Sequence, residues 1–318
     1  MAKGRNRKPQ RGGPKGGGQQ GRGGQQRQGQ RKGGQQRGTQ SRSGPPRSGQ
    51  RAGGDQHDGA PGSTGEGRRH RGPGGDRVEG RQAVRELLLA DTRKVREIVM
   101  QTGLDTADIL EDIEMLAADR RVSIREVGRN AFDGLAQTES AQGVLAEAEP
   151  LPTVEIEDLI EQPNPFLVMV DGVTDPHNLG AIFRSADASG ATGIVLPRHR
   201  SARIGPTVSK TAAGAIEHVP VANVAGVPAA IQTLQKHNVW VIGLDEAADR
   251  SIFDFDIADQ PICLVLGAEG PGLSRLTRER CDQLVSIPMQ GSVASLNVSA
   301  AATVAMFDVA RRRLGRGN

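Results

Sequence analysis

The sequence predicts an α/β protein that is built around a mostly parallel sheet and preceded by a polar tail, and three observations support this. Short apolar runs such as "FLVMVDGV" and "ICLVLGAE" lack polar alternation, as expected of strands that are buried on both faces. Segments of helical length lie between these runs. A change in composition near residue 77 separates the foldable chain from a polar N-terminal tail.

Residues 1–76 form a tail rich in Arg, Gly and Gln. It contains no Val, Ile, Leu, Phe or Trp, so we expect it to be disordered by itself. The tail has 17 Lys/Arg against 4 Asp/Glu, a charge of +13, whereas residues 77–318 have 24 against 33, a charge of −9. This asymmetry favours a tail that contacts RNA phosphates, and the alternative is an extension that only improves solubility.

Helix and strand alternate in the first foldable segment, which predicts a small α/β domain over residues 77–150. An acidic, proline-containing linker follows over 151–164. The expected elements of the domain are helices at 80–90 and 107–120, strands at 95–101 and 122–128, and a short strand that ends near residue 150.

The alternation is clearer in a second domain over residues 165–318, where ligands should gather at the carboxyl ends of the parallel strands. The expected strands are 166–173, 193–197, 219–224, 239–246, 262–269 and 283–289. The expected helices are 178–189, 207–217, 227–237, a short one at 276–282, and a final helix that follows Asn297.

The sequence lacks the motifs of Rossmann dehydrogenases, P-loop NTPases, zinc hydrolases and serine hydrolases, which argues against these four classes. No GxGxxG follows a predicted strand, and there is no GxxxxGK[ST], HExxH or GxSxG. Cys263 and Cys281 are too far apart for a CxxC pair, so we expect neither a metal site nor a disulfide. No stretch has membrane-spanning length and no secretory or mitochondrial leader is recognisable, which predicts a cytoplasmic protein.

Three strand ends carry residues that suit ligand binding. In "VDGVTDPHNLGAIFRSAD", Asn178 is placed to cap a helix and Arg184 lies two turns inside it. In "LVLGAEGPGLSR", a buried strand ends in glycines around Glu269, which suits close approach of a ligand to the backbone. By itself, the first stretch is better explained by an ordinary helix cap and a surface arginine. The second stretch by itself is equally compatible with a simple turn that carries a solvent-facing Glu.

The third strand end is "SIPMQGSVASLNVSAAA", where the last strand passes into the last helix. It contains Ile287, Ser295, Leu296 and Asn297. Small residues at the start of a helix permit either tight packing or close approach of a ligand. By itself the stretch is also consistent with ordinary capping by Ser or Asn.

Taken together and in this order, the three segments resemble the motifs of the SpoU/TrmH branch of the SPOUT RNA methyltransferases, over about residues 77–318. The resemblance implies a C-terminal domain with a deep trefoil knot, which is a rare exception to the rule against knotted chains. It also implies S-adenosylmethionine as the cofactor, no metal, and a homodimer. Residues 77–150 resemble the small L30e-like domain that precedes the knot in members that modify guanosine in 23S rRNA.

The resemblance also implies a set of site residues. The catalytic residues would be Asn178, Arg184, Glu269, Ser295 and Asn297. The residues that bind the cofactor would be Gly243, Leu244, Gly267, Gly270, Ile287, Met289 and Leu296.

The implied reaction is methyl transfer to a ribose 2′-hydroxyl of RNA. We assign Arg184 to binding phosphate and stabilising the forming alkoxide, because a guanidinium hardly ever gives up its proton. The expected target is a guanosine of 23S rRNA, although this chain has Ala141-Gln142-Gly143 where such members often have His-Gln-Gly. A tRNA ribose, an adenosine target of the thiostrepton-resistance type, and a non-catalytic RNA-binding or ribosome-assembly factor are the alternatives.

Overall fold

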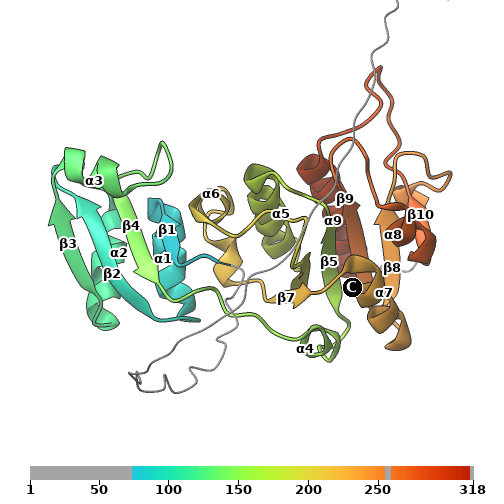
Figure 1. Cartoon of the computed structure of the whole chain (residues 1–318), viewed down its shortest axis with the longest axis horizontal. Helices are drawn as coiled ribbons and strands as arrows, with labels where there is room; N and C mark the ends of the chain where they lie inside the picture. The colour runs from blue at the N-terminus through green and yellow to red at the C-terminus, as the bar shows by residue number, and fades with distance from the viewer. Residues whose placement is uncertain (1–73, 255–258, 316–318) are drawn as a thin grey trace, which may run out of the picture. The chain divides into compact units, whose positions relative to one another are not determined.

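The computed structural model describes residues 74–254 and 259–315, so the predicted tail at 1–76 lies almost wholly outside the described residues. The described chain contains two separate sheets (Figure 1). One has four strands and belongs to the first predicted domain. The other has six strands and belongs to the second.

The four-stranded sheet is mixed, since β2 and β3 are parallel and the other neighbours are antiparallel. Leu87, Leu88, Ile98 and Ile113 are fully buried between the sheet and the first two helices. The strands, in sheet order, are β1 (Arg77–Glu79), β4 (Val144–Ala148), β2 (Val95–Gln101) and β3 (Ser123–Val127), and the helices are α1 (Arg81–Ala90), α2 (Asp108–Asp119) and α3 (Arg129–Leu135).

The six-stranded sheet is parallel throughout, as the continuous apolar strands predicted. Its strands, in sheet order, are β10 (Gln283–Val285), β8 (Trp240–Leu244), β9 (Ile262–Gly267), β5 (Phe166–Asp171), β6 (Gly193–Pro197) and β7 (Val221–Val224). Alternate residues of the central strands belong to two different cores, because the sheet is covered on both faces.

One face of this sheet packs against α5 (Pro176–Ala188) and α9 (Val298–Gly315), and α6 (Pro206–Thr211) packs against α5 (Figure 1). The other face packs against α4 (Ile156–Ile160) and α7 (Val227–Lys236). The short helix α8 (Arg275–Arg280) packs against α7, and two 3₁₀ turns, η1 (Ala215–Glu217) and η2 (Ile252–Asp254), complete the described elements.

Several predicted boundaries are wrong. The expected helix at 207–217 is two short pieces, because Ala213 and Gly214 adopt positive φ angles of 52° and 90°. The expected last strand at 283–289 ends at Val285. The segment expected to be a linker, 151–164, stays a prediction and includes the short helix α4. The three-residue strand β1 and the helix α3 lack a long periodic pattern and were not predicted.

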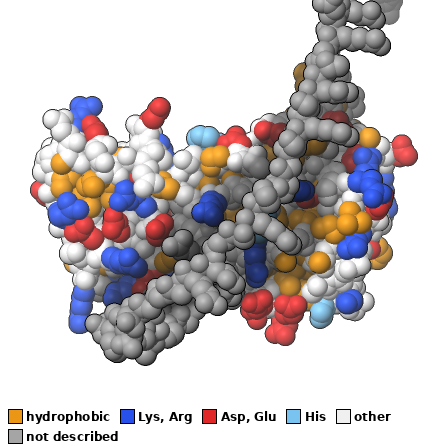
Figure 2. All heavy atoms as spheres, in the orientation of Figure 1, with side chains coloured by type: hydrophobic (Ala, Val, Ile, Leu, Met, Phe, Trp, Pro, Cys, Tyr) orange, Lys and Arg blue, Asp and Glu red, His pale blue; other side chains and the backbone are white. Residues whose placement is uncertain are grey.

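The described surface carries charges of both signs. Figure 2 shows Lys/Arg and Asp/Glu side chains interspersed on one face of the molecule. No helix within the described ranges is long and apolar enough to cross a membrane.

Candidate active site

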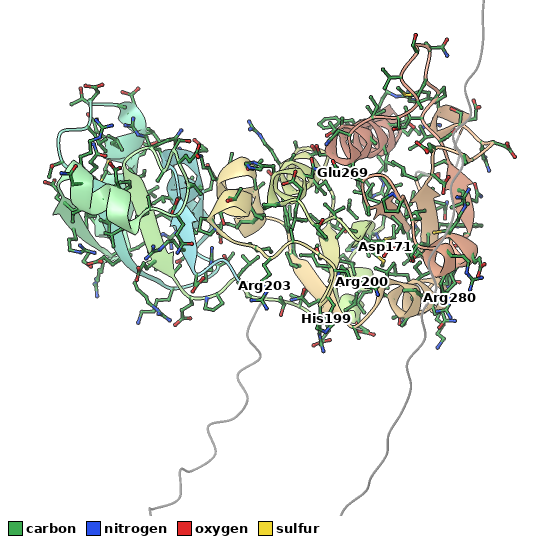
Figure 3. All side chains as sticks on the ribbon, turned by 45° about the horizontal axis from the view of Figure 1, so that its top comes forward. Asp171, His199, Arg200, Arg203, Glu269 and Arg280 are labelled. Carbon is green, nitrogen blue, oxygen red and sulfur yellow. The ribbon has the colours of Figure 1, made fainter. Side chains whose placement is uncertain are left out.

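The three predicted site segments lie at the carboxyl ends of β5, β9 and β10. From β5 the chain runs outward through β6 to β7, and it then returns to the other side of β5 with β8 and β9. Parallel sheets leave a crevice at the carboxyl ends of the strands where the direction of winding reverses. Asp171 at the end of β5 and Glu269 just after β9 mark this edge (Figure 3).

Asp175, and not Asn178, caps the helix α5. The Asp175 carboxylate accepts a hydrogen bond from the backbone N–H of His177 at 2.9 Å, and Pro176 occupies the first helical position. The expectation that Asn178 caps this helix is therefore wrong. The other oxygen of Asp175, Oδ2, accepts a hydrogen bond from Asn178 Nδ2 at 3.3 Å, so the capping residue also helps to orient the buried amide of Asn178.

Asn178 and Asn297 both donate to Glu269. The Asn178 Nδ2 group donates to Glu269 Oε1 at 2.6 Å, and the Asn297 Nδ2 group donates to the same oxygen at 2.8 Å. Asn297 Nδ2 also lies 3.0 Å from Asn178 Oδ1, which closes the network. The structure thus joins three residues that are 91 and 28 positions apart in sequence.

The other end of the Asn297 amide begins the last helix. Asn297 Oδ1 accepts hydrogen bonds from the backbone N–H of Ser299 at 2.9 Å and from the Ser299 hydroxyl at 2.6 Å. With its oxygen engaged in the cap, the amide can only present its NH₂ group to Glu269 and Asn178. The start of α9 therefore orients the network.

Glu269 retains acceptor capacity. Its Oε1 atom accepts the two amide donors, whereas Oε2 has no hydrogen-bond donor within the described part of the chain. An ionised carboxylate has about four lone-pair positions. Glu269 can therefore accept an N–H or O–H group from a bound ligand while its own position stays fixed by the two asparagines.

A cavity of about 530 Å³ adjoins this network. Its lining residues are mainly glycine and apolar residues, and Asp245, Glu246, Glu269 and Arg278 are the charged ones. Of the residues that the sequence analysis assigned to the cofactor, it is lined by Leu244, Gly267, Gly270, Ile287, Met289 and Leu296. Gly243 does not line it, because its Cα faces the side chains of Leu273, Leu284 and Cys281.

Two predicted catalytic residues are not joined to the network. Ser295 lines the cavity, but its hydroxyl makes no hydrogen bond to a described residue. Arg184 is exposed on α5 and has no ion-pair partner among the residues that the structure describes. A role for Arg184 thus requires a substrate or another chain.

Two features of the site were missed from the sequence. Asp175 before Pro176 has the pattern of a helix cap, so local reasoning could have found its role. The ion pair between Asp245 and Arg278, 2.8 Å long, joins positions 33 apart and leaves no local signal.

The described residues include no group of three or more His, Cys, Asp or Glu side chains that could hold a metal ion. Cys263 is fully buried and its burial raises the pKa of its thiol. Burial raises the pKa of the Cys281 thiol to about 12, and the nearby carboxylates of Asp282, Asp171 and Asp245 act in the same direction. Neither thiol is thus a reactive nucleophile near neutral pH.

The sequence matches two known protein families. The SpoU rRNA Methylase family matches residues 165–307, and the family described as RNA 2′-O ribose methyltransferase substrate binding matches residues 77–154. A 23S rRNA (guanosine-2′-O-)-methyltransferase RlmB of Pseudomonas putida is 39% identical over 243 residues, which cover 75% of this chain and 97% of that protein. The protein of the same name from Ralstonia nicotianae is 43% identical over 238 residues, covering 74% and 94%.

Solved structures agree with these matches. The SpoU methyltransferase AviRb from Streptomyces viridochromogenes has a TM-score of 0.65 and 27% identity, over 76% of this chain and 90% of that one. The same enzyme in complex with the cofactor AdoMet has a TM-score of 0.63, over 75% and 90%. The three site segments lie at one edge of the sheet, and relatives of about 40% identity match this chain along nearly the whole of their own length. The chain therefore belongs to the SpoU rRNA methylase family.

Proposed function

We propose that the protein transfers a methyl group from S-adenosylmethionine to the ribose 2′-hydroxyl of a guanosine in 23S rRNA. The observation that carries this proposal is the Asn178–Glu269–Asn297 network beside the 530 Å³ cavity. The names of the relatives, which are 23S rRNA guanosine methyltransferases, support the choice of target. The match of residues 77–154 to a substrate-binding family supports RNA as the substrate.

The cavity suits S-adenosylmethionine in size and chemistry. Small-molecule sites usually measure about 300–1,000 Å³, so a volume of about 530 Å³ is adequate. Apolar groups of Ile287, Met289 and Leu296 would cover the adenine ring, and the backbone at Gly267 would allow its close approach. The carboxylates on the wall favour the positively charged sulfonium and ammonium groups.

S-adenosylmethionine supplies an electrophilic methyl group when it is bound. The residues of this chain would align the ribose hydroxyl with that group and stabilise the charge that develops on its oxygen. The products would be the methylated ribose, S-adenosylhomocysteine and one proton, which would pass to solvent. Arg184 would bind a phosphate of the target nucleotide and stabilise the forming alkoxide, because its guanidinium keeps its proton. Glu269 would accept a hydrogen bond from a ligand N–H or O–H through its Oε2 atom.

The proposal includes a homodimer. The exposed position of Arg184 on α5 and the exposed Phe307 on the neighbouring helix α9 support a second chain at this face. The two helices are already joined by the hydrogen bond between Ser185 and Thr303, 2.7 Å long. Sedimentation of the full chain tests this part of the proposal, and a monomer at the concentration used for activity would contradict it.

The remaining sequence predictions stay part of the proposal. They are the division into 1–76, 77–150, 151–164 and 165–318, an L30e-like first domain, the trefoil knot in the second domain, and a location in the cytoplasm, where ribosomal RNA is found.

Calorimetric titration of the full chain with S-adenosylmethionine tests the cofactor site. We expect saturable binding that is lost in Leu296→Arg, because a guanidinium group would fill part of the cavity. Val293→Arg is the matched control, since Val293 is in the same loop, is 68% exposed and does not line the cavity. Equal binding by the two variants would exclude this cavity as the cofactor site, and no binding by the wild type would favour a non-catalytic RNA-binding factor.

Mapping of ribose methylation in ribosomal and transfer RNA tests the target. A strain that lacks the gene should lose one guanosine 2′-O-methyl group from 23S rRNA, and expression of the wild type but not of Asn178→Ala should restore it. An unchanged 23S pattern would refute the proposed target. A loss from tRNA or from an adenosine would identify the corresponding alternative.

A further inference from the structure

The loop between β6 and α6 carries three arginines and a histidine close together in sequence. Arg198, His199, Arg200 and Arg203 lie within six residues, and all four are exposed. None of them has a carboxylate within ion-pair distance among the described residues. The group is unusual because residues 77–318 have a net charge of −9, from 24 Lys/Arg and 33 Asp/Glu. We call residues 198–203 the basic loop.

The structure fixes the backbone of the basic loop at two points and that of the residue after it at a third. The Arg198 N–H donates to the Val224 carbonyl at 2.9 Å, and the Ala202 N–H donates to the Val173 carbonyl at 2.9 Å. The next residue after the loop, Ile204, forms a parallel bridge with Gly74. Three arginines and a histidine on a fixed backbone lose little further backbone freedom when they bind, which favours a binding function.

The basic loop is hydrogen-bonded to the segment that leads into Asn178. Val173 lies between the end of β5 and Asp175, which caps the helix that holds Asn178. Loop and motif thus share the carboxyl edge of the parallel sheet. Figure 3 shows His199, Arg200 and Arg203 along one side of the ribbon and apart from Glu269. A ligand that reached both places would have to be extended.

RNA is such a ligand, and its phosphates suit exposed arginines. A guanidinium group presents paired N–H donors that match two phosphate oxygens. We propose that the basic loop binds backbone phosphates of the RNA that flanks the target nucleotide and so helps to place the target ribose at Asn178. This inference rests on the proposed function and adds a substrate contact outside the cofactor cavity.

The salt dependence of RNA binding by the full chain tests the loop. Each lost phosphate contact lowers the slope of log K against log salt by about 0.7 for single-stranded RNA and about 0.9 for a duplex. For Arg198→Gln, Arg200→Gln and Arg203→Gln combined, we expect the slope to fall by about 2 to 3 on a 23S rRNA fragment. The KM for RNA should rise, whereas kcat and the Kd for S-adenosylmethionine should stay unchanged.

Arg275→Gln is the matched control for each single substitution. Arg275 is also exposed, at 84%, but it is already paired with Glu279 on its own helix. Its removal changes the net charge by the same amount as removal of Arg200. The inference is refuted if Arg200→Gln and Arg275→Gln give the same slope and the same KM for RNA.

The two proposals fail in different ways. Wild-type protein that does not methylate the 23S fragment would refute the proposed function, whatever the slopes. The slope comparison decides for or against the basic loop in either case, because it measures binding and not methyl transfer. Unchanged calorimetric binding of S-adenosylmethionine by the variant shows that the substitutions leave the fold intact.

Discussion

Replacement of Gly267 by Ala should disrupt the proposed cofactor cavity with a single methyl group. A Cβ atom at this position would lie 2.3 Å from the backbone carbon of Gly272 and 2.4 Å from the backbone nitrogen of Leu273. Carbon atoms in favourable contact are about 3.5–4.0 Å apart, so the loop after β9 would have to move by about 1 Å. This loop cannot yield easily, because the N–H groups of Ala268 and Gly272 each donate to the carbonyl of the other residue at 3.0 Å.

The expected cost follows from this overlap. Overpacking of a well-packed site costs about 1–3 kcal/mol, which corresponds to a fall in Tm of roughly 2–12 °C for a chain of this size. Because the displaced loop forms one wall of the cavity, the affinity for S-adenosylmethionine should also fall, by about tenfold or more, equivalent to about 1.4 kcal/mol.

Thermal unfolding and calorimetric titration of the same preparation measure both effects. Gly291→Ala is the control, because a Cβ atom at Gly291 would have no neighbour within 4 Å. It should leave the Tm and the affinity unchanged. A Gly267→Ala protein with the Tm and affinity of the wild type would show that the loop does not pack against the end of β9.

Three further predictions concern charged and reactive groups. Glu269→Gln should lower the rate of methyl incorporation by about 10²-fold with unchanged circular dichroism, because the carboxylate charge is lost, and an unchanged rate would contradict its role. Arg93→Met should lower the Tm by roughly 6–20 °C, because it leaves the carboxylate of Glu217 buried without a partner. The side chains of Arg93 and Glu217 are 2% and 0% exposed. A fall in Tm of less than 2 °C would contradict this role of the ion pair. Cys281, with a thiol pKa of about 12, should resist iodoacetamide at pH 8 in the native protein. It should react only when urea unfolds the chain or the pH approaches 12. Mass spectrometry measures the labelling, and equal labelling with and without urea would refute this prediction.

Much of the fold could be predicted because its strands have a clear physical signature. β5 and β9 are buried on both faces, so their sequences are continuously apolar and their assignment as strands was confirmed. The predicted helix at 207–217 was wrong because its break depends on a distant contact. At Gly214 a Cβ atom would lie 2.3 Å from the Cβ of Glu86 in the first domain, and a local pattern cannot contain that information.

The candidate site could be predicted as a set of segments but not as a network. Asn178, Glu269 and Asn297 each follow a different strand, and no spacing rule brings residues 91 and 28 positions apart to one oxygen atom. Sheet order does so, because it places β5 next to β9. Resemblance to the family supplied the grouping before the structure supplied its physical cause.

Asn297 acts both as a helix cap and as a residue of the candidate site. An amide has an acceptor at one end and two donors at the other, and the structure uses both. The Oδ1 atom begins α9, and this bond turns the NH₂ group toward Glu269 and Asn178. Aspartate at this position could supply the cap equally well but would place a second carboxylate against Glu269. The network, and not the helix, therefore requires asparagine here.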